Sequence, residues 1–363
     1  MNPLSKKVNP EMVEMAREAR GLTQTALADR LDCTQATVSK IEKGALPVSP
    51  EMLKRLSETL DYPEDFFCQK GGIYTPGIKY RRSRSRLRAR DRDRLDAKHN
   101  IRARVISELL ESIEIEGGNI PSMPVEEYDS PAEVAQELRE YWGISPGPVG
   151  NLTRLIERNG GIIVHTDFQT GEMDGVYYPF PDIPPTIFLD KNQPGDRLRF
   201  TLAHELGHIV MHQHPTDPEK VEDQTNVFAG EFMMPEEDIR PQLQRLDLRK
   251  LAQLKPKWGI SMAALLVRAD EIGAISHRKY RSLWAKMGKA GYRKREPAEL
   301  DVPKEEPKLE SRLVEAHLNE LGYSVEELAE SVHLNIDDFR DQVYDDRGGD
   351  NSESKKLHLN GHH

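Results

Sequence analysis

Residues 197–208 read Arg-Leu-Arg-Phe-Thr-Leu-Ala-His-Glu-Leu-Gly-His and contain the pattern His-Glu-x-x-His. On a helix, His204 and His208 lie one turn apart on the same face, close enough to share one metal ion. Glu205, next to the first histidine, can remove a proton from a water molecule at that ion. The flanking residues are apolar, and a buried helix that carries two histidines and a glutamate needs a reason to do so. The segment therefore predicts a metal-binding helix with Glu205 as the general base.

The third ligand of this predicted site has three candidates, because a tetrahedral catalytic zinc ion takes three protein ligands and keeps one position for water. His214 has the spacing of metzincins, but Met211 stands where that class needs a glycine. Glu222 begins a second helical segment, 222–235, and would meet the ion if this helix crosses the first. Glu231, further along the same segment, is a weaker candidate.

Composition limits the class of protein. The chain has 363 residues, which predicts two or three domains. Its formal net charge of −10 excludes a uniformly basic coat for nucleic acid but allows a local basic patch. Two cysteines, Cys33 and Cys68, exclude a disulfide-stapled scaffold and a multi-cysteine zinc ribbon. No apolar run approaches the roughly 20 residues of a membrane span, and the N-terminus lacks a signal peptide's apolar core. We expect a soluble cytoplasmic protein with no membrane partner.

Residues 8–67 predict a compact helical unit, because apolar residues recur at helical spacing and threonines stand at N-cap positions. Within this unit, residues 22–44 contain two short helices joined by a tight turn. The side chains that face outward at the start of the second helix are Thr34, Gln35, Ala36, Thr37, Ser39 and Lys40. A helix-turn-helix presents its base-reading side chains at this position. Glutamine can bond an adenine edge, and lysine can contact guanine or a phosphate.

The segment 79–94 holds nine Lys or Arg among its sixteen residues. It fits either a solvated linker or an arm that contacts DNA phosphates. Helices are predicted over 95–116, 131–142 and 151–158 and from about 197 onward, and strands over 161–165, 176–178 and 185–190. The strands at 161–165 and 185–190 could offer an edge to an extended peptide. His165 and Tyr177 are candidates for stabilising an oxyanion.

The fold class expected is α+β and mostly helical: an all-α helix-turn-helix bundle, a central domain with a small β-sheet and a helical C-terminal region. The predicted domains are a helix-turn-helix domain at 1–70, a basic linker and helix at 71–130, a catalytic domain at 131–297, an acidic helical region at 298–345 and a disordered tail at 346–363.

Residues 22–44 resemble the XRE (Cro/repressor-like) helix-turn-helix family through the pattern Leu-Thr-Gln-x-x-Leu-Ala…Ser-x-Ile-Glu-x-Gly. This resemblance implies that Gln24 contacts a DNA phosphate. It also implies that Gln35, Thr37 and Lys40 read bases. Double-stranded DNA is therefore an expected partner.

A second resemblance covers about 130–297. The stretch at 197–208, the pattern Glu-x-x-x-Asn-x-Phe-Ala at 222–229, and the flanking segments 141–150 and 258–269 are similar to the ImmA/IrrE metallopeptidase family. The resemblance implies a zincin-like domain in which His204, His208 and Glu222 bind Zn²⁺ and Glu205 is the general base. The chain departs from the family in having Thr225 where alanine is usual.

Residues 322–339 echo the helix-turn-helix at 21–38, yet the segment 301–345 has thirteen acidic and four basic residues, which would repel DNA. We interpret these helices as a packing element, with a partner or dimerisation surface as the alternative.

Together these patterns predict a zinc-dependent regulatory endopeptidase that binds DNA and cleaves a repressor or antitoxin-like protein in a stress or mobile-element response. A homodimer is also considered. The alternative function is a non-proteolytic DNA-binding regulator or antitoxin-like protein whose zincin-like domain serves as a sensor or partner-binding module.

Overall fold

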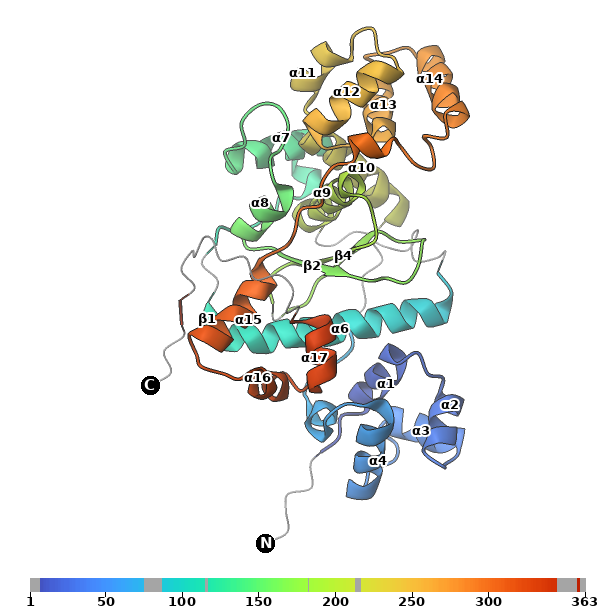
Figure 1. Ribbon diagram of the computed structural model, residues 1–363, viewed down its shortest axis with the longest axis vertical. Helices are drawn as coiled ribbons and strands as arrows, with labels where there is room; N and C mark the ends of the chain where they lie inside the picture. The colour runs from blue at the N-terminus through green and yellow to red at the C-terminus, as the bar shows by residue number, and fades with distance from the viewer. Residues whose placement is uncertain are drawn as a thin grey trace.

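The computed structural model describes residues 7–74, 87–114, 117–181, 183–212 and 217–344, together with the backbone of 358–359. Its parts are stacked along one long axis (Figure 1). A helical bundle lies at one end, one long helix and a small sheet lie in the middle, and a second group of helices lies at the other end. Among the described residues, no helix is long and apolar enough to cross a membrane. The α+β, mostly helical fold class is confirmed.

The N-terminal bundle is built as the sequence predicts. Its elements are α1 (Pro10–Ala19), α2 (Gln24–Arg30), α3 (Gln35–Glu42), α4 (Pro50–Leu60) and the 3-10 helix η1 (Glu64–Cys68). Thr23 Oγ1 accepts a hydrogen bond from Ala26 N at 3.1 Å and begins α2. Thr34 Oγ1 does the same for Thr37 N at 3.2 Å and begins α3. Each cap satisfies a backbone N–H that would otherwise lack an intrahelical partner.

The long helix α6 (Ala89–Glu111) differs from the helix predicted over 95–116. It begins inside the basic run, so 89–94 are helical, while 79–86 of that run lie outside the described residues. Its face with Ile101 and Val105 joins the core of the N-terminal bundle, and its face with Ile106 packs under the sheet. A helix buried on two sides is a shared core element, which the predicted division into a linker and helix at 71–130 does not describe.

The sheet has three strands in the order β2–β4–β3. They are β2 (Ile162–Thr166), β3 (Gly175–Tyr178) and β4 (Thr186–Asp190). β4 is parallel to β2 and antiparallel to β3. Residues alternate between the two faces, as strand geometry requires: Phe188 faces α6, and Ile187 faces the helices on the other side of the sheet. Because β4 is central, the prediction that 185–190 offers a free edge is wrong.

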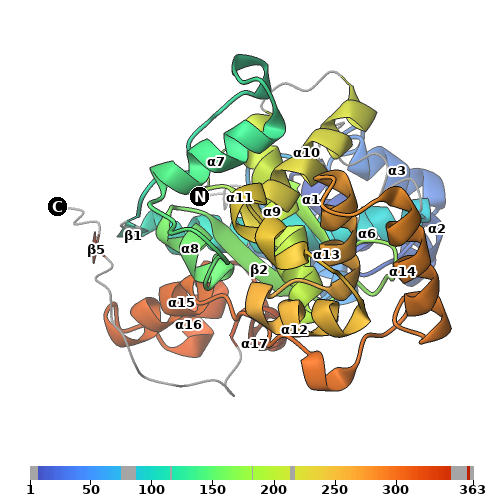
Figure 2. The same ribbon diagram turned by 90° about the horizontal axis from the view of Figure 1, so that it is seen from above.

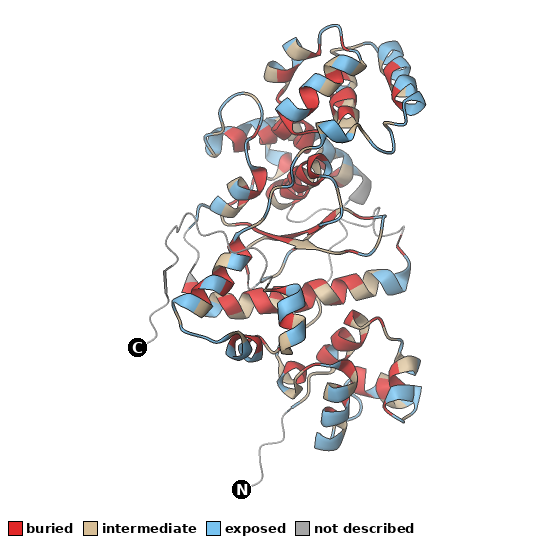
Figure 3. Ribbon diagram, in the orientation of Figure 1, coloured by how far each residue is buried: buried red, intermediate tan, exposed pale blue. Residues whose placement is uncertain are grey.

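The helices of the second group lie on the other side of the sheet, the nearest of them against its strands and the rest beyond (Figure 1 and Figure 2). They are α7 (Pro131–Tyr141), α8 (Leu152–Arg158), α9 (Gly195–Met211), α10 (Pro218–Met233), α11 (Glu236–Ile239), α12 (Leu248–Trp258), α13 (Met262–Glu271) and α14 (His277–Lys289), with short 3-10 turns η3 (Val125–Glu127), η4 (Arg240–Leu243) and η5 (Ala298–Leu300). Buried residues concentrate in α9 and α10, which form the centre of this core (Figure 3).

After η5 the chain runs back along the molecule to α15 (Leu309–Asn319), α16 (Val325–Ser331) and α17 (Ile336–Gln342) (Figure 1). These helices pack on α6 and on the N-terminal bundle. Phe339 is fully buried in the same core as Met12, and Asp338 pairs with Arg20 at 2.5 Å. The packing interpretation of the acidic C-terminal helices therefore agrees with the structure. A two-residue strand, β1 (Ile113–Glu114), pairs with β5 (His358–Leu359), and the rest of the predicted tail lies outside the described residues.

Candidate metal centre and nucleic-acid interface

Helix α9 carries His204, Glu205 and His208 through the middle of the domain. Its apolar side chains, including Leu202 and Leu206, are buried against the sheet and the neighbouring helices. The helical repeat places the two histidines on one face, and their Nε2 atoms lie 3.2 Å apart. His208 is fully buried. Two imidazoles held this closely in a buried setting need either a shared proton or a shared cation.

Helix α10 crosses α9 at Gly207 and brings Glu222 to the same point. A Cβ atom at Gly207 would lie 2.8 Å from Cδ1 of Phe228 and 2.9 Å from Cγ2 of Thr225, so only glycine allows this approach. Glu222 Oε2 then lies 3.5 Å from Nε2 of His204, and its Oε1 lies 3.8 Å from Nε2 of His208.

The three side chains fit a tetrahedral zinc ion. Ligand atoms that bind zinc at about 2.0–2.2 Å in tetrahedral geometry lie about 3.4 Å from one another. The two Nε2 atoms lie 3.2 Å apart, and Glu222 faces them with one oxygen each, Oε2 at 3.5 Å from His204 and Oε1 at 3.8 Å from His208. With one donor atom taken from each residue, all three lie within 4.8 Å of one another, so a small adjustment of the carboxylate would reach the zinc spacing. They form the one group of metal-binding character found among the described residues. Their role as ligands stays a prediction.

Hydrogen bonds on the far side of each imidazole orient these histidines. Asn226 Oδ1 lies 3.2 Å from Nδ1 of His204, and Thr225 Oγ1 lies 3.3 Å from Nδ1 of His208. An acceptor at Nδ1 places the ring proton there and leaves Nε2 with its lone pair. In both rings Nε2 is the atom that faces Glu222. Neither Asn226 nor Thr225 was identified from the sequence as an orienting group.

The electrostatics of the group favour positive charge. Burial alone would lower the pKa of His204, but the carboxylates of Glu222 and Glu205 outweigh burial and raise this pKa. A divalent cation at this point would meet the same attraction. The potential of the site is therefore suited to a metal ion.

Glu205 is held beside the group by the sheet. Its side chain is buried, and Oε2 accepts a hydrogen bond from the backbone N–H of Tyr177 in β3 at 3.0 Å. Tyr177 thus reaches the site through its backbone N–H, as a partner of the Glu205 carboxylate. His165 lies in β2, separated from β3 by β4, and its Nδ1 is 3.6 Å from Glu306. The suggestion that His165 stabilises an oxyanion is not supported by this placement.

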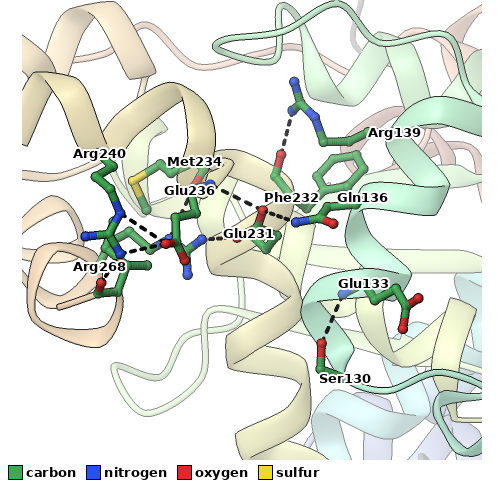
Figure 4. Close-up of polar contacts among 11 residues, drawn as sticks. Ser130, Glu133, Gln136, Arg139, Glu231, Phe232, Met234, Glu236, Arg240 and Arg268 are labelled. Carbon is green, nitrogen blue, oxygen red and sulfur yellow. Dashed lines mark hydrogen bonds and ion pairs between the residues drawn. The ribbon is translucent and has the colours of Figure 1, made fainter. Parts of the chain in front are cut away.

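The other candidates for the third ligand have different positions. Glu231 lies nine residues after Glu222, on the opposite face of α10. It is buried and bonds the guanidinium of Arg268 and Nε2 of Gln136, the latter at 2.8 Å (Figure 4). This carboxylate is part of the packing between α7, α10 and α13, so Glu231 as a metal ligand is wrong. His214 lies outside the described residues.

The predicted DNA-reading residues lie at the start of α3 and on the adjacent end of α2. Gln35 and Lys40 are exposed, as is the N-cap Thr34. Gln35 Nε2 donates to Gln24 Oε1 at 2.6 Å, and Gln24 Nε2 donates to Glu42 at 2.7 Å. The two glutamines are thus positioned relative to each other across the turn. Thr37 is half-buried, with Oγ1 2.9 Å from that of Thr34.

Comparison with protein families supports both halves of this description. Residues 157–270 match the IrrE N-terminal-like domain, Peptidase_M78, and residues 13–67 match a helix-turn-helix domain. This pair of domains has the ImmA/IrrE architecture. No curated protein matches the chain.

The M78 match includes α9 and α10 and therefore every member of the metal-binding group. M78 is a family of zincin-like metallopeptidases, which agrees with the donor set of two imidazoles and one carboxylate. The helix-turn-helix match includes α2 and α3. The chain thus combines a DNA-binding type of domain with a metallopeptidase type of domain.

Proposed function

We propose that this protein is a zinc-dependent regulatory endopeptidase that binds double-stranded DNA through its helix-turn-helix domain and cleaves a repressor or antitoxin-like protein. The observation that carries the proposal is the convergence of His204, His208 and Glu222 within 4.8 Å, with the buried carboxyl of Glu205 on the same helix. Cleavage of a repressor would switch transcription in a stress or mobile-element response.

The chain's own residues would divide the chemistry as follows. His204, His208 and Glu222 would hold Zn²⁺, which when bound acidifies water and polarises a peptide carbonyl. Glu205 would accept the proton of the attacking water and pass it to the leaving amine. The N–H of Tyr177 fixes the orientation of Glu205 through Oε2, so the carboxyl is held in place before substrate arrives.

An extended substrate would bind along β3. β3 and β4 are antiparallel, so every second residue of β3 forms backbone hydrogen bonds with β4. Asp190 N donates to Asp174 O, so Asp174 is one of the residues that bond β4. The intervening residues, Gly175 and Tyr177, therefore direct their backbone groups away from β4. Tyr177 N–H bonds Glu205, which places this edge next to the metal group. A peptide that adds to β3 would lie with one of its carbonyls near the ion.

A cavity of about 480 Å³ next to the metal group gives room for a substrate side chain. It lies beside Asn226, which bonds His204, and beside Phe200, one turn before His204 on α9. Its walls combine apolar side chains, among them Val227 and Val267, with the charged side chains of Asp223, Arg268 and Glu271. Such a lining would suit a substrate side chain that has both an apolar portion and a polar end.

The partners in this proposal are DNA and a protein substrate, in the cytoplasm, and a homodimer can be checked by mass in solution. The direct test is co-expression with the product of the adjacent open reading frame, followed by mass analysis of fragments. We expect discrete fragments of the partner with the wild-type chain and intact partner with Glu205→Gln. A stable complex in which neither chain is cut would support the antitoxin-like alternative. A metal-free protein that binds DNA would support the sensor.

A further inference from the structure

Arginines from α6 and from the turn after α1 surround a cavity of about 260 Å³ at the junction of the helix-turn-helix domain and α6. The cavity is lined by Arg20, Gly21, Arg88, Arg90, Asp91 and Arg94. Four guanidinium groups and one carboxylate therefore line the cavity, and one of the four, that of Arg20, is paired with Asp338. Figures 1 and 2 both place this end of α6 on the same side of the molecule as α2.

The backbone of Gly21 organises the cluster. Arg90 donates to the carbonyl of Gly21 through Nε at 3.1 Å and also through Nη2. Gly21 has a positive φ of 67°, and a Cβ atom there would lie 3.4 Å from Cδ of Arg94. The turn before α2 is thus tied directly to the first turns of α6.

The arginines of the cluster differ in their contacts. Nε of Arg94 is buried and has no hydrogen-bond partner among the described residues. Arg88 is exposed at the N-cap of α6 and lines the cavity. Arg20 differs, because its guanidinium already pairs with Asp338 at 2.5 Å. Arg88 and Arg94 both line the cavity, so an anion there would lie beside their guanidinium groups.

The local potential is positive. Helix α6 is 23 residues long, and its N-terminus adds partial positive charge to that of the arginines. Lys98, one turn beyond Arg94, has a lowered pKa, first because of burial and then because of the charge of Arg94. Asp91 and Asp93, both on the first turns of α6, offset part of this charge.

We infer that Arg88, Arg90 and Arg94 form a binding site for a phosphate group of the DNA backbone beside the helix-turn-helix. This inference rests on the proposed DNA-binding function. Gly21 is three residues from Gln24, and three residues span at most about 11 Å, so a duplex on α3 passes close to the cluster. The site would add affinity without reading sequence, because phosphate contacts position a protein on DNA and base contacts specify.

The test is duplex binding by the full chain as a function of salt. Arg88→Gln combined with Arg94→Gln should weaken binding to operator and unrelated duplexes alike. It should also reduce the slope of log K against log[salt] by about 1, because one phosphate contact contributes about 0.9. The matched control removes two exposed arginines of the other half, Arg249→Gln with Arg278→Gln, and should leave the slope unchanged. An equal loss of slope in this control would contradict the inference.

Further measurements separate the remaining outcomes. Arg88→Gln alone changes only an exposed side chain and should still lower the slope, so the test does not depend on the folding of the double variant. Titration with inorganic phosphate distinguishes a free anion from DNA. Suppose that phosphate raises the unfolding temperature of the wild type but not of the double variant, while the salt slope for DNA is the same in both proteins. This result would overturn the assignment to DNA. If the wild-type chain binds no duplex at all, the proposed function fails instead.

Discussion

The hydroxyl of Thr225 lies 3.3 Å from Nδ1 of His208 and 2.6 Å from the backbone carbonyl oxygen of Val221. A carbonyl only accepts, so the hydroxyl donates its one proton to Val221 and must accept from His208. This contact keeps the proton of His208 on Nδ1 and directs the lone pair of Nε2 toward Glu222. Thr225 is also the position at which the chain departs from the alanine usual in the family that it resembles.

Replacing this hydroxyl should weaken metal binding. Thr225→Val keeps the shape of the side chain but removes the acceptor, and loss of such an orienting contact costs about 10- to 100-fold in metal affinity. Competition with a chromophoric chelator measures this affinity. Thr225→Ser retains the hydroxyl and should bind zinc like the wild type. Equal affinities for the valine and serine variants would show that the hydroxyl has no orienting role.

The proposed ligand set predicts the metal content. We expect about one zinc ion per wild-type chain and loss of this ion in His204→Ala, because two remaining ligands do not hold a catalytic zinc ion. Glu222→Gln should also reduce zinc content. Elemental analysis after dialysis provides the measurement, and His277→Ala, at an exposed position on α14, is the control. Full zinc occupancy in His204→Ala would mean that the ion binds elsewhere.

Substitution of Glu205 should abolish cleavage without loss of zinc, unlike substitution of a metal ligand. Glu205→Gln leaves the three ligands in place and retains an oxygen for Tyr177 N–H, so zinc content should not change. Without the general base, cleavage of the partner protein should fall by about 100-fold or more. Fragment formation over time, followed by mass spectrometry, checks both statements on one sample. Unchanged cleavage would remove the endopeptidase function from this site.

Much of this site could be predicted because its strongest signal is local. The spacing of His204 and His208 needs only the helical repeat, and the caps at Thr23 and Thr34 need only their neighbours. Glu222 is different: its approach depends on how closely α10 crosses α9 at Gly207, which periodicity within either helix does not reveal. The backbone contact of Tyr177 with Glu205 depends in turn on which strand forms the edge of the sheet.

The boundaries of α6 could not be predicted for another reason. The run 88–94 is rich in arginine and aspartate, so composition alone favours a solvated segment. Arginine and alanine are good helix formers, however, and tertiary contacts such as that of Arg90 with Gly21 stabilise this end of the helix. The same limit applies to the C-terminal helices, whose apolar faces are visible in the sequence but whose packing partner, more than 200 residues away, is not.

The residues at the start of α3 should determine operator preference. Gln35→Ala with Lys40→Ala removes the two exposed side chains best suited to base edges, so affinity for an operator should fall to that for unrelated duplexes. A loss of about 1–3 kcal/mol per base contact is expected. Binding to paired operator and scrambled duplexes measures the difference. Persistent preference in the double variant would show that other side chains read the bases.

Stability should depend on pH through Glu18 in the N-terminal bundle. Burial, followed by the nearby carboxylates of Glu14 and Asp93, raises the pKa of Glu18 to about 7, although Arg17 opposes the shift. Between its ordinary value of about 4.5 and 7, the folded state holds a proton that the unfolded state has released. The free energy of unfolding should therefore decrease as pH rises through this interval.

Glu18→Gln remains neutral and should remove this loss. The unfolding free energy of the variant minus that of the wild type should therefore be larger at pH 8 than at pH 4. Urea unfolding of both proteins at the two pH values measures the change. A stability difference that is the same at both values would mean that Glu18 does not carry a raised pKa in the folded protein.

The core shared by Met12 and Phe339 has a consequence for the synthesis of this protein. The N-terminal bundle emerges from the ribosome long before α15–α17, which complete its hydrophobic core. Until then its apolar surface stays exposed to chaperones and to other nascent chains. A prematurely terminated chain would lack these helices even if its peptidase-like domain were whole, and we expect the cell to recognise it as misfolded. Contacts that join the two ends of the sequence also make folding slow, because the longest loop must close before they form.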